Sequence, residues 1–261
     1  MKTEQSEVSA ELIRNSINNN AAKKLIIVAT YNERDNIEPL LADIYSFAPD
    51  VNVLVVDDSS PDKTYEIVGK LADTIYKDKL FLLKRAGKLG LGTAYVAGFN
   101  WGIEHKYDVI MEMDADFSHN PKYLPQFFEE IKTNDLVIGS RYIPGGGVVN
   151  WGLGRKIISQ GGSIYSRFIL GLKTRDLTGG FKCYRREVLE KIDVNELKSN
   201  GYSFQIEGTY KTFLNGFKIK EIPIIFEDRR VGQSKMSGGI FIEALLMVLK
   251  LRLHKKEFIK H

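Results

Sequence analysis

The sequence predicts an α/β fold in which helices flank a mostly parallel central sheet. Short apolar runs alternate with segments of helical periodicity from residue 24 to about residue 140. Such alternation is typical of βαβ units, whose strands run parallel to one another. The chain has 261 residues, 43% of them apolar, which is enough for one large domain with a sizeable core.

Five apolar runs are expected to form the strands of this sheet, because each is short and rich in Val, Ile and Leu. Two longer segments between them carry apolar residues at helical spacing, and Pro61 marks the start of a further helix, where its missing N–H costs little. The expected strands are 24–29, 51–56, 81–83, 109–113 and 136–138, and the two helices are 36–47 and 93–104.

The second half of the chain is less regular. A glycine-rich break at 144–147 precedes an expected helix, and a turn at 178–180 precedes another. The expected elements there are helices at about 157–170, 204–215 and 240–256, a strand at 218–226 and a Gly/Ser-rich loop at 229–239. We therefore divide the chain into a polar tail (1–22), one α/β domain (23–237) and a C-terminal amphipathic helix (238–261).

Bulk properties exclude several classes of protein. The net charge of +4 is mild, and no basic stripe with interleaved aromatics indicates nucleic-acid binding. The one cysteine, Cys183, cannot form an internal disulfide, and its apolar neighbours favour a buried structural thiol in a reducing compartment. No apolar run resembles a signal peptide or reaches the roughly 20 residues that span a bilayer.

Acidic pairs follow two of the expected strands. Asp57-Asp58 ends one strand and Asp114-Ala115-Asp116 ends another. Two carboxylates at this spacing suit a hard divalent cation that leaves room for phosphate oxygens, and a solvated acidic turn is the alternative. Because ligands bind beyond the carboxyl ends of parallel strands, and both pairs lie at that edge, the position favours a cation site.

Glycine-containing segments supply further candidates. The run from Lys88 to Ala94 leads into a helix, whose first N–H groups can hold an anion, although the spacing is not that of a P-loop. No G-x-G-x-x-G follows the first strand, which argues against a dinucleotide oxidoreductase. Four basic residues in or beside such segments could together hold two phosphorylated substrates: Arg141, Arg155, Arg229 and Lys235.

Seven segments in order resemble one known family, the dolichol-phosphate or polyprenol-phosphate mannose synthases of glycosyltransferase family 2. The similarity runs from about Lys24 to Ser237 and indicates the branch without a fused transmembrane domain. Its segments are Thr30-Tyr31-Asn32-Glu33, Val56-Asp57-Asp58-Ser59-Ser60-Pro61-Asp62, Leu89-Gly90-Leu91-Gly92-Thr93-Ala94-Tyr95, Met113-Asp114-Ala115-Asp116-Phe117-Ser118-His119, Gly139-Ser140-Arg141-Tyr142, Asp176-Leu177-Thr178-Gly179-Gly180-Phe181 and Gly232-Gln233-Ser234-Lys235.

This resemblance implies a GT-A type fold, GDP-mannose as donor and a polyprenyl or dolichyl phosphate as acceptor. By carry-over, Asp116 would ligate Mg²⁺ or Mn²⁺, with Ser118 at a position where relatives often have Gln. Ala29 stands where the family usually has Pro. The resemblance assigns the nucleotide-sugar to Ala29, Tyr31, Glu33, Val56, Asp58, Asp114, Ala115, Asp116, Arg141, Arg155, Arg229 and Lys235, and catalysis to Asp116, Arg141, Arg229 and Lys235.

The expected reaction is a single displacement that inverts the anomeric carbon. A lipid phosphate is already ionised at neutral pH, so no catalytic base is required. Two alternatives remain open from the sequence. One is the same carrier with another donor sugar, glucose or N-acetylglucosamine, and the other is a catalytically silent nucleotide-sugar-binding subunit.

The expected location is cytoplasmic, at the surface of a membrane that holds the polyprenol. The last helix is apolar from Ala244 to Leu249 and basic at its end, which suits interfacial docking. A helix packed on the core is an equal alternative. The resemblance also allows for a membrane-anchoring protein partner.

Overall fold

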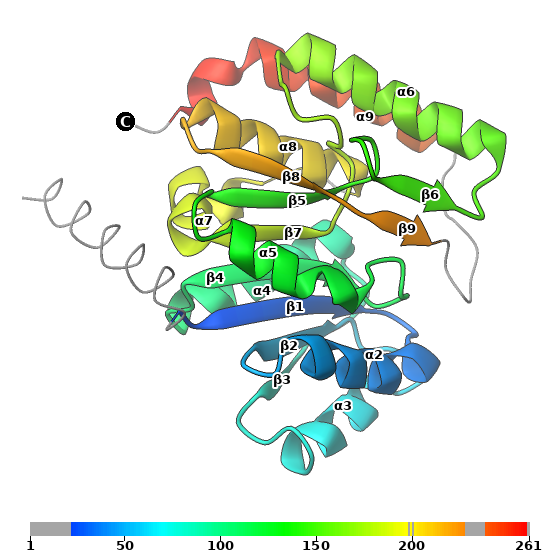
Figure 1. The fold of residues 1–261 in the computed structure, drawn as a ribbon, viewed down its shortest axis with the longest axis vertical. Helices are drawn as coiled ribbons and strands as arrows, with labels where there is room; N and C mark the ends of the chain where they lie inside the picture. Colours follow the sequence, from blue (N-terminus) through cyan, green and yellow to red (C-terminus); the bar gives the residue numbers. More distant parts are fainter. Residues whose placement is uncertain (1–21, 198, 200, 228–237, 260–261) are drawn as a thin grey trace, which may run out of the picture.

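A seven-stranded sheet runs through the computed structural model, which describes residues 22–197, 199, 201–227 and 238–259. Its strands lie in the order β3 (Leu80–Lys84), β2 (Asn52–Asp57), β1 (Lys24–Thr30), β4 (Val109–Asp114), β7 (Lys182–Arg185), β5 (Leu136–Ser140) and β8 (Ile219–Pro223), as Figure 1 shows. Every neighbouring pair is parallel except the two pairs that β7 makes. The mostly parallel sheet predicted from the sequence is confirmed.

Strand β7 is antiparallel to both of its neighbours and was not predicted from the sequence. It is short, and two of its four residues, Lys182 and Arg185, are long cations that break the apolar pattern expected of a central strand. Both are nevertheless buried. Cys183 lies between them with no exposed surface, which confirms the expected buried thiol, and burial raises the pKa of that thiol.

Helices cover both faces of the sheet. On β1, Ile26 and Val28 pack with α2 (Arg34–Phe47), α3 (Thr64–Asp73) and α5 (Leu124–Glu130) in one apolar cluster. The alternate residues Leu25 and Ile27 pack with α4 (Leu91–Glu104), α7 (Arg186–Ile192) and α8 (Tyr202–Leu214) in another. The continuous apolar run of β1 therefore reflects a strand buried on both faces.

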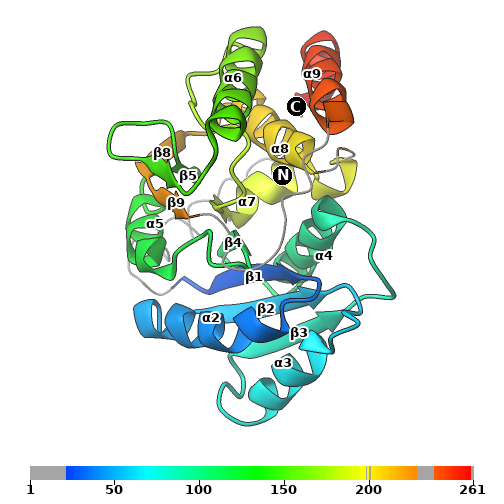
Figure 2. The same cartoon turned by 90° about the vertical axis from the view of Figure 1, so that its right-hand side faces the viewer.

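A third apolar cluster lies on the outer side of α8. There α6 (Leu153–Leu170) and α9 (Gly238–Leu253) lie side by side (Figure 2). Val248 and Leu251 of α9 are buried against Leu170 of α6 and Tyr210 of α8. Among the described residues, no helix combines the length and the apolar character that crossing a membrane requires.

Most predicted elements are present with small shifts in their ends. The helix after Pro61 begins at Thr64, and α5 and α7 were not assigned from the sequence. The predicted strand 218–226 is divided between β8 in the large sheet and β9 (Ile225–Glu227), which pairs with β6 (Gly147–Val149) in a small second sheet. Residues 1–21 of the predicted tail and 229–237 of the predicted loop lie outside the described residues.

Candidate functional site

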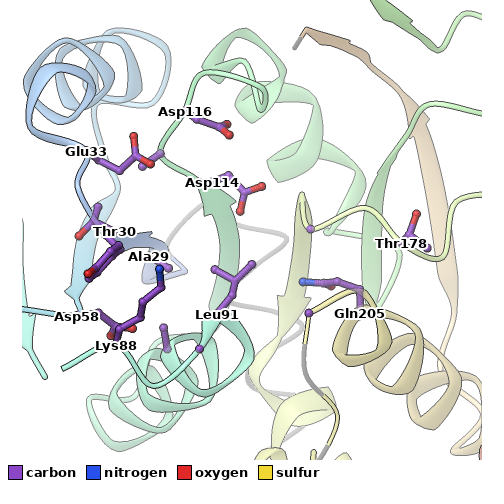
Figure 3. Close-up of a pocket in the computed structure, with 16 residues that line it drawn as sticks. Ala29, Thr30, Glu33, Asp58, Lys88, Leu91, Asp114, Asp116, Thr178 and Gln205 are labelled. Atoms are coloured by element: carbon purple, nitrogen blue, oxygen red, sulfur yellow. The ribbon is translucent and has the colours of Figure 1, made fainter. Parts of the chain in front are cut away.

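A cavity of about 420 Å³ opens where β1, β2 and β4 end (Figure 3). Parallel register brings these ends together, because Ala29 of β1 pairs with Val56 of β2 on one side and with Asp114 of β4 on the other. Seven of the residues that sequence reasoning assigned to the nucleotide-sugar line this cavity: Ala29, Tyr31, Glu33, Asp58, Asp114, Ala115 and Asp116.

Of the five other assigned residues, the structure describes the side chains of Val56 and Arg141 only, and neither lines the cavity. The side chain of Val56 is fully buried in the apolar cluster under α4, so only its backbone faces the strand end. Arg155 belongs to α6, but its side chain is outside the part of the chain that the structure describes. Arg229 and Lys235 also lie outside the described residues. Their predicted roles stay predictions.

The two aspartates at the end of β2 have different environments. Asp57 is fully buried and accepts hydrogen bonds from the hydroxyls of Thr30 and Ser60, at 2.8 and 2.6 Å. Asp58 reaches the cavity, and its carboxylate is paired with the guanidinium of Arg85 through Nε at 2.6 Å and Nη2 at 2.5 Å. Arg85 therefore balances the charge of Asp58, and neutral hydroxyl groups satisfy the carboxylate of Asp57, so neither side chain requires a bound cation as its partner.

The turn after β4 fixes the second acidic pair. The Asp114 carboxylate accepts a hydrogen bond from the Tyr95 hydroxyl at 2.9 Å, and its backbone N–H donates to Nδ1 of His119, also at 2.9 Å. Oδ1 of Asp116 accepts from the backbone N–H and the hydroxyl of Ser118, at 3.1 and 2.5 Å. Phe117, between Asp116 and Ser118, has a φ of 64°. This conformation is unusual for a bulky residue, so the packing of the turn must stabilise it.

His119 supports this turn as a neutral ring. Nδ1 accepts the Asp114 N–H, so this nitrogen carries no proton. The ring is 1% exposed and stacks on Phe181 with centroids 4.7 Å apart. Burial lowers the pKa of His119, and this effect exceeds the opposing influence of Asp114 and Asp116. The histidine therefore serves as a fixed hydrogen-bond acceptor in this turn.

The oxygen donors at this turn fit a divalent cation whose remaining ligands come from a substrate. Among the described residues, no group of three or more His, Cys, Asp and Glu side chains is placed to hold a metal by itself. Asp116 and Ser118 offer a carboxylate and a hydroxyl beside the cavity. Mg²⁺ typically binds one or two carboxylates and completes its shell with phosphate oxygens and water, which matches this donor set.

Arg141 lies deep in a buried ion pair. Its Nε and Nη2 donate to the two carboxylate oxygens of Asp176, each at 2.7 Å, and the two residues are 6% and 0% exposed. The rings of Tyr142, Trp151 and Phe226 lie 5.1 to 5.5 Å from the guanidinium carbon. Burial alone would raise the pKa of Asp176, but Arg141 lowers it overall, so the carboxylate is ionised.

Sequence reasoning gave no role in the site to two further cavity residues. Nζ of Lys88 lies 4.0 Å from the centre of the Tyr31 ring. In the sequence, only its position in the glycine-containing segment 88–94 indicated that Lys88 could belong to the site. Gln205 enters from α8, on the side of the cavity away from Asp58 and Lys88 (Figure 3). No local motif marks Gln205, because its position depends on how α8 packs against β4 and β7.

Comparisons with known proteins agree with this geometry. The family model described as glycosyl transferase family 2 matches residues 25–193. Undecaprenyl-phosphate mannosyltransferase of Micrococcus luteus is 47% identical over 228 residues, which are 87% of this chain and 92% of the relative. Polyprenol monophosphomannose synthase of Mycolicibacterium smegmatis is 46% identical over 230 residues, which are 87% of this chain and 85% of the relative.

Solved structures show the same fold at low sequence identity. Glucosyl-3-phosphoglycerate synthase of Mycobacterium tuberculosis, in complex with Mn²⁺, UDP and glucosyl-3-phosphoglycerate, is 15% identical with a TM-score of 0.62, over 95% of this chain and 85% of that chain. Its complex with Mn²⁺, UDP and phosphoglyceric acid gives a TM-score of 0.63 at 17% identity, over 95% and 84% of the two chains. The GT-A type fold is thereby confirmed.

The sequence resemblance, the fold and the cavity at the strand ends lead to one assignment. Both curated relatives are mannosyltransferases by name, and each shares close to half of its aligned residues with this chain. The chain therefore belongs to glycosyltransferase family 2, alongside these two polyprenol-phosphate mannosyltransferases, and is a hexosyltransferase.

Proposed function

We propose that the protein transfers mannose from GDP-mannose to a polyprenyl monophosphate, with inversion at the anomeric carbon. One observation carries this proposal: residues from three strand ends that the family resemblance assigns to the donor line a single cavity. The names of the two relatives support the choice of mannose and of a polyprenyl phosphate. Their identity to this chain over 87% of its length supports the same substrates here.

The nucleotide occupies the β1 and β2 side of the cavity in this proposal. Tyr31, Glu33 and Asp58 supply an aromatic face and hydrogen-bond acceptors there, and Val56 and Ala29 contribute backbone. The pairing of Asp58 with Arg85 keeps this carboxylate oriented and its charge balanced. Ordered acceptors of this kind can receive the N–H groups of a nucleobase.

The diphosphate lies toward the end of β4, where we assign Mg²⁺ or Mn²⁺ to Asp116 with Ser118 beside it. When bound, such an ion stabilises negative charge on the departing diphosphate. The Ser118 hydroxyl holds the Asp116 carboxylate at 2.5 Å, so its first role is to orient that ligand. Arg141, Arg155, Arg229 and Lys235 are assigned to the phosphates of donor and acceptor, as basic residues suit.

Positioning is the main task of the protein in the reaction. The second pKa of a phosphate monoester is about 6, so the attacking oxygen is ionised without a protein base. The Tyr95 hydroxyl and the His119 ring fix Asp114 in place at the cavity wall. A preorganised wall of this kind holds the reacting atoms in line and excludes water from the anomeric carbon.

The acceptor requires contact with a membrane, and we assign this contact to α9 together with α6. One face of α9 is packed on the core, whereas Leu246, Leu249 and Leu253 on its other side are exposed, Leu253 at 80%. Phe168 on the neighbouring α6 is 85% exposed. The two alternatives for α9 are thus compatible, because the same helix packs inward and presents an apolar surface outward. Exposed Lys250 and Arg252 suit anionic headgroups.

A donor screen tests the proposed reaction. Radiolabelled GDP-mannose, UDP-glucose and UDP-N-acetylglucosamine are each incubated with a short polyprenyl phosphate and Mg²⁺ or Mn²⁺, and the lipid is extracted. We expect label in the lipid only from GDP-mannose, and a β-linked product by NMR from the α-linked donor. Label from another donor, or retained configuration, would contradict the proposal. Asp116→Asn serves as the control for chemistry at this site.

A further inference from the structure

Lys88 places a positive charge in the cavity that forms no ion pair with another described residue. Among the described residues that line the cavity, it is the only cation. The contact that the structure gives its ammonium group is with the ring of Tyr31, whose centre lies 4.0 Å from Nζ. Figure 3 shows the side chain extending into the cavity. The side chain is exposed, so the N–H donors of the ammonium group are accessible to a ligand.

The backbone around Lys88 is anchored to the site. The N–H of the next residue, Leu89, donates to Oδ2 of Asp58 at 3.2 Å. The guanidinium of Arg85 donates to Oδ1 of Asp58 at 2.6 Å and to the carbonyl oxygen of Gly90 at 3.3 Å. These contacts keep the backbone of Lys88 beside Asp58, whereas its long, flexible side chain can change its rotamer when a ligand binds.

A nucleobase stacked on the Tyr31 ring would replace this ammonium group. Stacked rings have their centres about 4.5 to 7 Å apart, so a base on this face of Tyr31 would occupy the position of Nζ, which lies 4.0 Å from the ring centre. A cation over an exposed aromatic ring is held only weakly. The base can therefore displace the ammonium group, which then lies beside the edge of the base.

Several groups of the proposed donor could accept a hydrogen bond from this ammonium group. They are the diphosphate oxygens, the hydroxyl groups of the ribose and the hexose, and O6 and N7 of guanine. The proposed function assigns the diphosphate to the end of β4, near Asp116, and the base to Tyr31 and Asp58, where Lys88 is held. O6 and N7 are adjacent acceptors on one edge of guanine, and lysine binds this pair of atoms in other guanine-recognition sites.

We propose that the ammonium group of Lys88 donates hydrogen bonds to O6 and N7 of the guanine base, which makes Lys88 a specificity-determining residue. This inference rests on the proposed function. Glu33 and Asp58 are the acceptors assigned to the N–H groups of the base, and Lys88 supplies the complementary donor. Adenine carries an amino group where guanine has O6, so it would place a donor against the ammonium group. Such a contact discriminates against the wrong base by about 5- to 150-fold.

Nucleotide affinities test the contact. The dissociation constants of GDP and ADP are measured by calorimetry in the presence of Mg²⁺, for the wild type and for Lys88→Met, which keeps the length of the side chain but removes its donors. We expect the wild type to bind GDP more tightly than ADP, and the variant to lose about 5- to 150-fold of this preference. GDP and ADP share the ribose and the diphosphate, so the ratio of their affinities cancels contacts with those groups.

Two further variants and one analogue sharpen the test. Lys88→Arg keeps donors that suit O6 and N7 and should retain the preference for GDP. Lys84→Met is the matched control, because Lys84 is also exposed, lies 3.4 Å from the centre of the Tyr65 ring and is not part of the cavity lining. This control should keep the wild-type ratio. The analogue 7-deaza-GDP, which lacks the N7 acceptor, should bind the wild type more weakly than GDP but bind Lys88→Met equally well.

The outcomes separate this inference from the function on which it rests. If the wild type prefers GDP and Lys88→Met keeps the whole preference, the inference is overturned. An equal fall in the GDP and ADP affinities of Lys88→Met would assign Lys88 to the ribose or the diphosphate and would also overturn it. If the wild type itself shows no preference for GDP over ADP and UDP, the proposed donor is wrong and the proposed function fails first.

Discussion

The ion pair between Arg141 and Asp176 offers a direct test of how the site is held. Asp176 is fully buried and accepts four hydrogen bonds: two from the Arg141 guanidinium at 2.7 Å, and one each from the backbone N–H groups of Arg141 at 2.9 Å and Gly179 at 3.1 Å. The substitution Asp176→Asn removes the negative charge and keeps the shape. It leaves the buried guanidinium without its counter-ion.

Breaking a buried pair on one side costs about 3 to 5 kcal/mol, because the remaining charge is uncompensated. Asparagine keeps one oxygen as an acceptor, so we expect the lower end, about 3 kcal/mol. In a chain of this size 1 kcal/mol corresponds to about 2 to 4 °C, so Tm should fall by about 6 to 12 °C. Urea unfolding followed by circular dichroism measures the free energy, and a thermal scan measures Tm.

A double variant separates the ion pair from simple loss of packing. Arg141→Met with Asp176→Leu replaces both charges by apolar groups and should be less destabilised than Asp176→Asn alone. The exposed pair between Lys63 and Glu66 is a matched control, and Glu66→Gln should change stability by less than about 1 kcal/mol. Additive effects in the double variant, or a loss in Asp176→Asn no larger than in the control, would refute the reasoning.

Three further predictions concern metal, pH and membrane. Mg²⁺ or Mn²⁺ should increase the affinity of the wild type for GDP, and Asp116→Asn should abolish this increase while the affinity without metal stays the same. Calorimetry measures both affinities. If the metal still increases the GDP affinity of the variant, the assignment of the metal to Asp116 is contradicted. Burial raises the folded-state pKa of Glu112 from 4.5 to about 7, so the folded protein binds an extra proton between these values and loses stability as pH rises through them. Relative to Glu112→Gln, wild-type stability should therefore fall from pH 5 to pH 7 by up to about 1.4 kcal/mol per pH unit, and a constant difference excludes the raised pKa. The double variant Leu246→Ser with Leu253→Ser should reduce binding to anionic liposomes, measured by sedimentation, at least about tenfold, because each inserted leucine contributes about 1.5 to 3 kcal/mol. Ile75→Ser, which changes another exposed apolar residue, is the control. An equal loss of binding in the double variant and in the control would rule out a specific membrane-binding surface on α9.

Local pattern was sufficient for much of the fold. The sequence predicted both ends of β1, β2 and β4 to within one residue. A strand buried on both faces must be continuously apolar, so its limits are visible in the sequence. Their parallel direction then followed from the helices between them, whereas their order in the sheet was not predicted. The cavity at their carboxyl ends was predictable for the same reason, and seven of the assigned residues line it.

Pairing across the chain was not predictable in the same way. Arg85, which neutralises Asp58, lies 27 residues further along the chain and stands in no recognisable motif. Lys182 is a lysine in the centre of a sheet, a position that its charge argues against until the buried Glu112 network is known. Gln205 contacts Glu112 across 93 residues. Such contacts depend on how helices dock on the sheet, which hydrophobic periodicity does not specify.

The sequence by itself determined the alternation of strands and helices, the edge at which acidic residues gather, and the family to which these motifs point. Only the tertiary structure decided which charges are already balanced by the protein and which polar atoms remain for a substrate. The physical reason is that periodicity is a property of neighbouring residues, whereas the charge and hydrogen bonding of a buried group depend on partners that folding brings from distant parts of the chain.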